Sequence, residues 1–600
     1  MTRPYAAARL GLVLACLTTA AAAADPGTPA AGDPKPVLVD LTLKGEVTES
    51  PSPLALDGRP IADDLRSVID TLARARDDTH VKALILRVHN LKIGLAKGHE
   101  LRQAVKNFRS SGKKAVAILE MAGNADYLVA AAADEVVMPE SGWLMLKGLA
   151  AEVTFYKTLF DRLGVQAETI QVGEFKGAGE PYSRTRMSPE FRQEIGSVLN
   201  DSYAMMAEAI AARQGITADA ARALIDGGPY TPDAARKLGL VNRVAYADQV
   251  EAEVARGLGL ASYRVETKYG KPSRDAADLS GLAGLMKMVQ VLSGEGAKKA
   301  ASKAPKVALI YASGVIQSGK SSASSILGGT VLGSDTVIKH LRQAEKDETV
   351  KAIVLRVDSP GGSALASDLM WREITRIEKP IVASMSDVAA SGGYYISMGC
   401  DKVYAEPGTL TGSIGVISVK LAVGGLLEKV GVTTDTVTVG KNGTFHSTIA
   451  PWTEAERAAM RRLSEEVYRQ FVAKAAKGRK MTFDRLEKKA GGRVYTGRQA
   501  KAEGLVDEVG TLADAIASAR ELAKLEPGTT TELLVLPRPQ SVLESLFAPL
   551  EERDRDAASS ALLATLPGPI RDPLSRLGRL AALLSSEPAV LLAPFELKVR

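Results

Sequence analysis

Two short apolar runs stand out in the pattern of hydrophobic and polar positions. Val-Lys-Ala-Leu-Ile-Leu-Arg-Val at residues 81–88 is nearly repeated by Val-Lys-Ala-Ile-Val-Leu-Arg-Val at residues 350–357. Both runs are rich in β-branched residues and have the length of a strand that is buried on both faces. An amphipathic stretch with helical spacing precedes each run, at residues 62–76 and 335–346. The pattern therefore predicts a helix followed by a buried strand at both places.

A second pair of similar segments shows that the repeat is long. Residues 230–242 are echoed by residues 495–507, and the offset between the two parts stays between 265 and 269 residues. Such an offset indicates a duplicated domain and not a short-period array. Because strands alternate with helices in each copy, the sequence predicts an α/β fold of two tandem βαβ domains with mostly parallel sheets.

The duplication divides the chain into six predicted parts. They are a signal peptide or membrane anchor (1–24), a flexible leader (25–36), the first repeat domain (37–292), a linker (293–306), the second repeat domain (307–535) and a C-terminal tail (536–600). The tail matches neither copy. Its apolar stretches, such as 562–570 and 580–584, leave three interpretations open: core-docking helices, a membrane-surface element or a subunit contact.

The N-terminal residues indicate export from the cytoplasm. Arg3 and Arg9 precede fifteen uncharged residues, Leu10–Ala24, that end in an alanine run. This order is typical of a secretory signal, and a spanning helix would need about 20 apolar residues. Cleavage near residues 22–24 is the favoured interpretation, with an uncleaved anchor or lipidation of Cys16 as the alternatives. The expected location is the periplasm or the periplasmic face of the inner membrane.

Composition narrows the class of protein without identifying it. The 600 residues are 46% hydrophobic and 24% charged, which excludes a disordered, collagen-like or polytopic membrane protein. A formal net charge of +6 is small for this length and argues against a nucleic-acid partner. With 5 His and no metal-binding spacing, we expect neither a metal ion nor a cofactor. Of the 2 Cys, Cys400 is expected to be a small buried residue.

The second copy contains two glycine-rich turns that directly follow apolar strands. One is Asp-Ser-Pro-Gly-Gly-Ser at residues 358–363, and the other is Ala-Ala-Ser-Gly-Gly-Tyr-Tyr at residues 389–395. Glycine at a turn leaves backbone N–H groups free to face a ligand, as an oxyanion site requires. A serine in such a turn, here Ser391, can act as a nucleophile.

The first copy lacks both features but has a lysine that the second copy lacks. It has His-Asn-Leu-Lys-Ile at residues 89–93 in place of the first turn, and Asn124 stands opposite Ser391 at an offset of 267. Its segment 173–181 contains Lys176, which faces Gly443 of the second copy at the same offset. A pair made across the duplication, Ser391 with Lys176, would therefore restore a catalytic dyad.

A lysine base is the better prediction because the histidines offer no triad. His340 and His446 lie in no glycine-rich or acidic setting, and no Gly-x-Ser-x-Gly elbow surrounds Ser391. Burial disfavours the charged form of lysine and can lower its pKa by several units. Phe175 and the small residues that follow Lys176 suit a side chain that enters a tight cleft. We then expect activity to rise toward alkaline pH.

Together these motifs resemble the long tandem-repeat form of the signal peptide peptidase SppA family, over residues 37–535. The motifs that carry the resemblance are residues 358–363, 389–395, 409–415, 173–181 with 187–189, and 495–507. The resemblance implies a Clp/crotonase-like fold and a Ser/Lys endopeptidase that cleaves signal peptides and other unfolded peptides through an acyl-enzyme.

The resemblance also assigns roles to four residues and suggests an assembly. The family's nucleophile falls on Ser391, its base on Lys176 and its oxyanion donors on Gly392 and Gly362. The resemblance further implies peptide substrates and a homotetramer that is anchored at the membrane. This chain departs from the family pattern at Gly177 and Gly179, where bulkier residues are expected, so we expect an altered cleft.

Three rival interpretations account for less of the sequence. Residues 314–321 fit the phosphate-loop pattern Gly-x-x-x-x-Gly-Lys-Ser, but the residues after them favour a loop over the helix that such a site needs. An acyl-CoA enzyme of crotonase type leaves the Ser391 and Lys176 segments unexplained. The third is a scaffold in which the dyad never assembles. Whether the dyad forms within one chain or between chains stays open, since either is possible.

Overall fold

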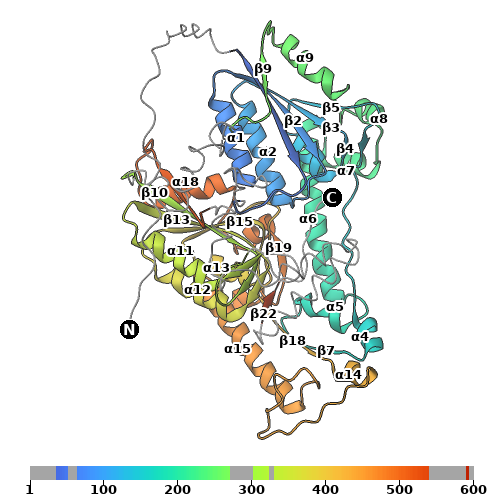
Figure 1. Cartoon of the computed structure of the whole chain (residues 1–600), viewed down its shortest axis with the longest axis vertical. Coiled ribbons are helices and arrows are strands. Elements are labelled where there is room, and N and C mark those ends of the chain that lie inside the picture. The colour runs from blue at the N-terminus through green and yellow to red at the C-terminus, as the bar shows by residue number, and fades with distance from the viewer. Residues whose placement is uncertain (1–34, 52–63, 271–301, 323–329, 539–589, 593–600) are drawn as a thin grey trace, which may run out of the picture.

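The architecture is given by a computed structural model that describes residues 35–51, 64–270, 302–322, 330–538 and 590–592 (Figure 1). The signal or anchor segment lies outside the described residues, as do nearly all of the predicted leader, most of the linker and most of the tail. None of the helices in the described part is both long enough and apolar enough to cross a membrane.

The first copy is built on a parallel sheet with the strand order β8-β5-β3-β2-β1-β9. Its strands are β1 (Val37–Lys44), β2 (Val81–His89), β3 (Lys114–Leu119), β5 (Glu135–Met138), β8 (Arg243–Val244) and β9 (Arg264–Glu266). Alternate residues of β2 belong to two different cores: Leu84 and Leu86 lie on one face, and Ala83 and Ile85 on the other. Both faces of the sheet are therefore covered, which explains the continuous apolar run in the sequence.

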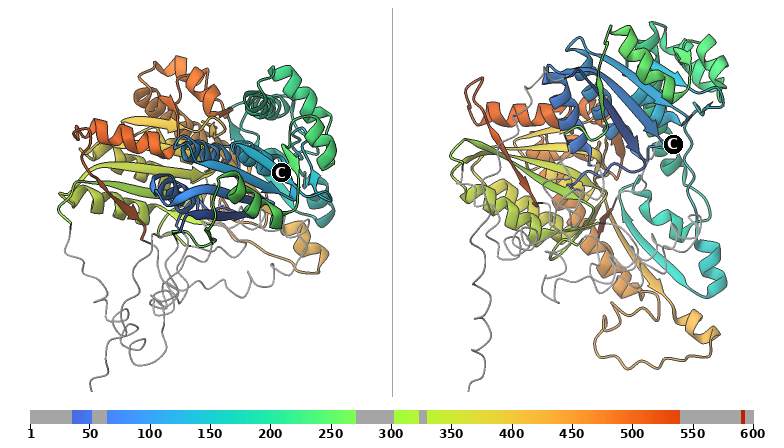
Figure 2. Two further views of the ribbon diagram at one scale, coloured as in Figure 1. Left: turned by 90° about the horizontal axis from the view of Figure 1, so that it is seen from above. Right: turned by 45° about the horizontal axis from the view of Figure 1, so that its top comes forward.

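The second copy repeats this plan in a separate sheet with the order β19-β17-β15-β13-β10-β21, to which β16 and β20 are added beside β15. Only β19 runs antiparallel to its neighbour. The strands are β10 (Lys306–Ser313), β13 (Val350–Ser359), β15 (Ile381–Ala390), β16 (Lys402–Ala405), β17 (Leu410–Gly412), β19 (Val494–Thr496), β20 (Glu508–Val509) and β21 (Glu532–Leu536). Figure 2 shows the blue strands of the first copy and the yellow-green strands of the second in neighbouring sheets.

The helices connect these strands, as the alternating pattern predicts. Those of the first copy are α1 (Leu65–Asp77), α2 (Leu95–Arg109), α3 (Asn124–Ala130), α4 (Lys157–Leu163), α5 (Glu180–Ser183), α6 (Pro189–Gln214), α7 (Ala218–Asp226), α8 (Pro232–Lys237) and α9 (Ala247–Gly257), with a 3₁₀ turn η1 (Gly177–Gly179). Those of the second copy are α11 (Ser334–Lys346), α12 (Ala364–Arg376), α13 (Gly392–Ser397), α14 (Gly424–Lys429), α15 (Glu454–Gly478), α16 (Phe483–Glu487), α17 (Gly497–Ala502) and α18 (Leu512–Leu522). The predicted fold class, α/β with two copies and mostly parallel sheets, is confirmed.

A third sheet joins the two copies, and the sequence did not predict it. Its order is β12-β11-β14-β22-β18-β7, formed by β7 (Gln166–Val172), β11 (Val315–Gln317), β12 (Val331–Gly333), β14 (Gly361–Ser363), β18 (Val416–Ala422) and β22 (Val590–Leu592). Strand β7 of the first copy runs antiparallel to β18 of the second along its whole length. This pairing brings the loop after β7 to the second copy. A further short pair, β4 (Met121–Ala122) with β6 (Trp143–Leu144), belongs to the first copy.

Polar contacts also cross between the copies at the N-terminus of α2. The carboxylate of Asp387 accepts hydrogen bonds from the backbone N–H groups of Gly94 and Lys97, at 3.0 and 3.1 Å. The Nζ of Lys97 lies 3.0 Å from Asp358 of the second copy. An aspartate at a helix N-terminus satisfies N–H groups that lack a partner within the helix. The second copy thus caps a helix of the first.

Candidate active site

Ser391 lies at the sharp turn between β15 and α13. Its backbone has φ 56° and ψ −113°, a conformation that residues with a side chain rarely adopt. Two hydrogen bonds hold this turn: the Ser391 N–H donates to the carbonyl of Gly412 and the Tyr395 N–H donates to the carbonyl of Ser391, both at 2.8 Å. The side chain of Ser391 is fully buried.

Lys176 lies on the loop after β7 and reaches Ser391 within the same chain. Its Nζ is 2.7 Å from the Oγ of Ser391, although the two residues are 215 positions apart. The lysine loop packs against the turn before β19, where the Phe175 N–H donates to the carbonyl of Gly491 at 2.8 Å. A Cβ on Gly492 would lie 2.5 Å from the Lys176 nitrogen, so only glycine fits there. The two residues that the duplication argument paired therefore meet, one from each copy.

The surroundings of Lys176 favour its neutral form. Its side chain is fully buried, and its remaining contacts are the carbonyl and the Oγ of Ser413, at 2.8 and 2.9 Å. No ion pair of Lys176 occurs among the described residues. Burial lowers the pKa of Lys176 to about 7, and the charge of Glu194 opposes this shift.

The predicted donors Gly362 and Gly392 lie next to each other. A Cβ added to Gly392 would lie 3.2 Å from the nitrogen of Gly362 and 3.0 Å from the Cα of Gly361. Gly361 and Gly362 have φ of 98° and 153°, and a Cβ on Gly362 would meet the carbonyl oxygen of Ile316 at 2.0 Å. Side chains are therefore excluded from this turn, and its backbone is left next to the serine.

The two unexpected glycines of the lysine loop are explained by close packing. A Cβ on Gly177 would lie 2.6 Å from the ring of Phe191, and one on Gly179 would lie 2.5 Å from Ile417. Helix α6 and strand β18 occupy the space that bulkier residues would need. The departures from the family pattern are thus matched by neighbouring side chains in this chain.

Sequence reasoning missed two residues that surround the lysine. Ser413 lies in the segment 409–415, which was recognised as a motif but given no role, and its φ is 54°. Glu194 on α6 is buried, and its Oε1 accepts the N–H of Val494 at 2.6 Å while its Oε2 has no partner among the described residues. Burial raises the pKa of Glu194 to about 8. The only local signal for Ser413 was the glycine directly before it, and nothing in the sequence singled out Glu194.

The rival predictions find no support in the geometry. Residues 315–317 of the phosphate-loop pattern form strand β11, which pairs with β12 and β14. In the part of the chain that the structure describes, neither His340 nor His446 hydrogen-bonds to Ser391. Asn124 opens helix α3 of the first copy, and its Oδ1 accepts the N–H of Lys147 at 3.0 Å. Cys400 is buried in the core of the second copy, as expected.

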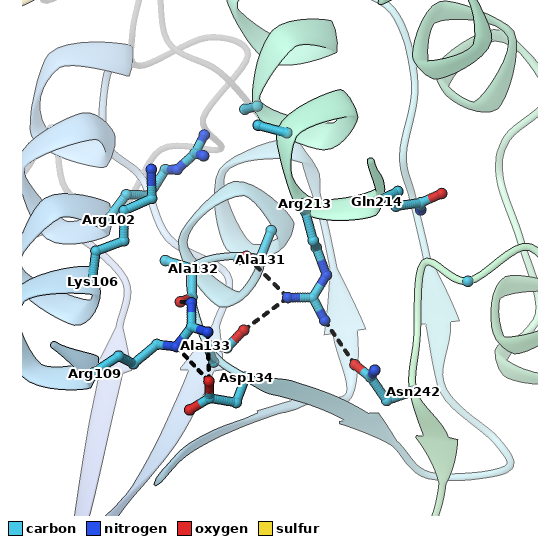
Figure 3. Close-up of a pocket in the computed structure, with 13 residues that line it drawn as sticks. Arg102, Lys106, Arg109, Ala131, Ala132, Ala133, Asp134, Arg213, Gln214 and Asn242 are labelled. Carbon is cyan, nitrogen blue, oxygen red and sulfur yellow. Dashed lines mark hydrogen bonds and ion pairs between the residues drawn. The ribbon is translucent and has the colours of Figure 1, made fainter. Parts of the chain in front are cut away.

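A separate cavity of about 470 Å³ lies in the first copy, and only first-copy residues line it (Figure 3). Two of its arginines are committed to the protein itself. Arg213 donates to the carbonyls of Ala131 and Ala133, and Arg109 is paired with Asp134. None of the residues around Ser391 lines this cavity, so it is not part of the serine site.

Comparison with known families and proteins gives one consistent result. Residues 107–261 and 373–526 match the family model "Peptidase family S49", and these segments contain Lys176 and Ser391 respectively. The chain is 30% identical to the chloroplastic serine protease SPPA of Arabidopsis thaliana, over 85% of this chain and 73% of that protein. It is 31% identical to Protease 4 of Salmonella typhi, over 84% of this chain and 79% of that protein.

Shorter relatives match part of the chain. A putative signal peptide peptidase SppA of Enterococcus faecium is 34% identical over 46% of this chain and 82% of that protein. Among solved structures, a mutant of ClpP1 from Listeria monocytogenes is matched over 35% of this chain and 94% of its own, with a TM-score of 0.23 and 16% identity. The matched family model occurs once in each copy of the duplicated domain, and two relatives match over most of their length. This chain is therefore a serine-type protease that belongs to peptidase family S49.

Proposed function

We propose that this protease is an endopeptidase in which Ser391 is the nucleophile and Lys176 is the general base and acid. The observation that carries the proposal is the 2.7 Å separation between the Lys176 Nζ and the Ser391 Oγ, in a fully buried site. A serine hydroxyl becomes an effective nucleophile when an adjacent base takes its proton. The separation lies within the range over which such a transfer occurs.

The contacts of Lys176 favour an orientation in which the lone pair of its neutral Nζ points at the Oγ of Ser391. With a pKa of about 7, a large share of the amine is neutral at neutral pH. A neutral amine has two N–H bonds, and the carbonyl and Oγ of Ser413 are the two acceptors available for them. The remaining lone pair then accepts the proton of Ser391, so Ser413 is a positioning residue for the base.

The chemical steps follow from these positions. As Ser391 Oγ bonds to the carbonyl carbon of a peptide, Lys176 takes the hydroxyl proton. The backbone N–H groups of Gly392 and Gly362 stabilise the negative charge that develops on the carbonyl oxygen. Lys176 gives its proton to the leaving amine, and an acyl-enzyme forms. Water, activated by the same lysine, then hydrolyses the ester.

For the substrates, we propose cleaved signal peptides and other unfolded hydrophobic peptides. The Enterococcus faecium relative is named as a putative signal peptide peptidase. The glycine turn β14 pairs on one side with the three-residue strand β22, and strand pairing of this kind recognises extended backbone, which folded proteins rarely present. The signal-like residues 1–24 favour action in the periplasm or at the periplasmic face of the inner membrane.

We also infer a homo-oligomer. The argument comes from two segments that correspond, each in the opposite copy, to the strands β7 and β18 that join the copies. At the offset of 267, residues 433–439 correspond to β7, and residues 149–155 correspond to β18. Both segments belong to no strand among the described residues, and Val437 and Val439 are 93% and 95% exposed. Pairing of 433–439 with 149–155 of a neighbouring chain would repeat the internal junction between subunits. Such head-to-tail contacts form a ring when the rotation between subunits closes, and a closed ring of four would be the tetramer that the resemblance implies.

The catalytic proposal is tested with three variants. Wild type should digest casein and react with a serine-directed fluorophosphonate probe, whereas Ser391→Ala and Lys176→Ala should each lose at least about 1000-fold in activity. Lys441→Ala is the matched control, because this lysine is exposed and lies in the loop that corresponds to the Lys176 loop. Casein digestion by both dyad variants at the wild-type rate would contradict the assignment.

A further inference from the structure

The cavity of about 470 Å³ in the first copy has far more positive than negative charge around it (Figure 3). Its lining includes three cations of α2, which are Arg102, Lys106 and Arg109, and a fourth, Arg213, near the end of α6. Among the described residues that line the cavity, Asp134 is the only acidic one. The cavity therefore has the charge of a site for an anion.

Two of the four cations already have partners within the protein. Arg109 is paired with one carboxylate oxygen of Asp134, and the other oxygen accepts a backbone N–H of β3 at 2.9 Å. Arg213 donates to the carbonyls of Ala131 and Ala133, at 3.0 and 2.8 Å. These carbonyls lie just after the end of α3, where a positive charge is favourable. Both Asp134 and this helix end are thus committed to Arg109 and Arg213.

Arg102 and Lys106 have no such partners. They are one helical turn apart on α2, and Figure 3 shows them side by side on the wall that faces α6. No hydrogen bond or ion pair within the described part of the chain involves either side chain, and the Nε of Arg102 is buried without an acceptor.

The electrostatic surroundings of these two side chains are correspondingly unfavourable. Burial lowers the pKa of Arg102, and burial together with the charges of Arg102 and Arg109 lowers the pKa of Lys106. A buried donor that has no acceptor costs free energy, and a charged one costs more. Such a group in a folded protein indicates a bound ion or water.

A phosphate group matches the two unpartnered cations better than a carboxylate does. A phosphate monoester carries a charge of about −1.5 to −2 at pH 7 and has three strong acceptor oxygens. A carboxylate has a single charge and would leave one of the two cations uncompensated. The planar guanidinium of arginine and the ammonium of lysine both bind phosphate oxygens well. The cavity volume lies within the usual range of ligand sites, about 300–1,000 Å³.

We propose that this cavity binds a phosphate group, either free or as a monoester, and that Arg102 and Lys106 hold its oxygens. Arg109 and Arg213 keep their present partners and add to the positive potential. None of these residues lies around Ser391, so the inference does not depend on the proposed protease mechanism.

Isothermal titration calorimetry of the full chain with inorganic phosphate, at constant ionic strength, is the first test. Wild type should bind phosphate, and Arg102→Met and Lys106→Met should each weaken binding at least about tenfold, because hydrogen bonds between charged groups are strong. Lys92→Met is the matched control, since this first-copy lysine is exposed and lies outside the cavity. Equal phosphate binding by wild type and both cavity variants would overturn the inference.

Vesicles distinguish a lipid headgroup from free phosphate as the source of the group. Cosedimentation is compared for phosphatidylcholine vesicles with and without phosphatidic acid, whose headgroup is a phosphate monoester. Binding that requires phosphatidic acid and is lost in the Arg102→Met/Lys106→Met double variant would assign the site to a lipid. Binding of inorganic phosphate without vesicle binding would assign it to free phosphate. A wild type that binds neither probe overturns the inference.

Thermal unfolding separates a ligand site from a structural role of Arg102. Because Arg102→Met removes a positive charge that has no partner in the described chain, the variant should have at least the wild-type Tm in phosphate-free buffer. Phosphate should raise the Tm of wild type by mass action and leave that of the variant unchanged. A lower Tm of the variant in phosphate-free buffer, with no response of wild type to phosphate, would show that Arg102 only stabilises the fold.

Discussion

In the second copy, β13 leads to Gly361 and Gly362, and β15 leads to Ser391. In the first copy, the corresponding strands β2 and β3 lead to backbone N–H groups that are bound by a carboxylate side chain. There, the carboxylate of Asp126 accepts the backbone N–H groups of Leu91 and Gly123, each at 2.8 Å. At the offset of 267, Gly393 stands where Asp126 stands, and a Cβ on it would meet the carbonyl of Ser359 at 2.5 Å.

This difference indicates how one fold can serve the proposed catalysis at one place and stability at the other. A side-chain carboxylate satisfies the backbone donors of the first copy permanently, so that end is closed to ligands. In the second copy Gly393 replaces this aspartate, and the carbonyl of Leu591 in β22 lies beside Gly361. The lysine that we propose as the base comes from the first copy through the β7–β18 pairing.

Among the variants that test this difference between the copies, Gly362→Ala should have the largest effect on kcat. The new methyl group would meet the Ile316 carbonyl at 2.0 Å and force the turn away from Ser391. Loss of one oxyanion donor typically lowers kcat by about 100- to 1000-fold. The matched control is Ile93→Val at the corresponding position of the first copy, which should keep full activity. Steady-state kinetics with a peptide substrate, alongside the Tm of both variants, checks this expectation; equal losses for the two variants would contradict it.

A smaller loss is expected from Ser413→Ala, which removes one of the two acceptors that orient the amine of Lys176. The base keeps its place but not its alignment, so kcat should fall by roughly 10- to 100-fold, less than the about 100- to 10,000-fold that a positioned base contributes in full. KM should change little, because Ser413 contacts the base. A kinetic comparison of wild type, Ser413→Ala and Ser413→Thr separates these effects, since threonine retains the hydroxyl. An unchanged kcat in Ser413→Ala would show that the carbonyl of residue 413 is sufficient.

Asp126→Asn should affect stability and leave activity alone. An amide oxygen can accept one of the two backbone N–H groups, but the amide NH₂ cannot accept the other, so a buried donor loses its partner. The expected cost is about 1–3 kcal/mol of unfolding free energy. Urea denaturation measures this cost, and casein digestion by the folded variant should stay within about twofold of wild type. A loss of activity without a loss of stability would assign a catalytic role to the first-copy end.

Local patterns predicted one helix and the buried strand after it correctly in each copy. The runs at 81–88 and 350–357 are β2 and β13, and the amphipathic stretches before them are α1 and α11 within a few residues. The pairing of Lys176 with Ser391 was also inferred from the sequence, because each copy lacked the residue that the other kept. Short-range periodicity and an internal repeat are both properties of the sequence itself.

The junctions between distant segments were not predictable in the same way. The β7–β18 pairing joins strands that are about 250 residues apart, and no local pattern specifies a partner at that distance. Strand β22 has three residues in a tail that offered several interpretations, and its partner is a glycine turn with no side chains to match. Glu194 was missed because its effect arises from burial beside Lys176, which a sequence does not display.

The smallest expected effect is a shift of the pH profile, which tests how the first copy tunes its lysine. We propose neutral Lys176 as the base, so kcat should fall about tenfold per pH unit below its pKa of about 7 and level off above it. The charge of Glu194 favours the protonated lysine, but burial raises the pKa of Glu194 to about 8, so this carboxyl is mostly neutral where the profile bends. Glu194→Gln should therefore move the acidic limb to lower pH by less than about one unit. An acidic limb that moves to higher pH in Glu194→Gln would mean that Glu194 does not oppose the effect of burial on the pKa of Lys176. In wild type, a limb near the ordinary pKa of lysine would mean that Lys176 is solvated during turnover.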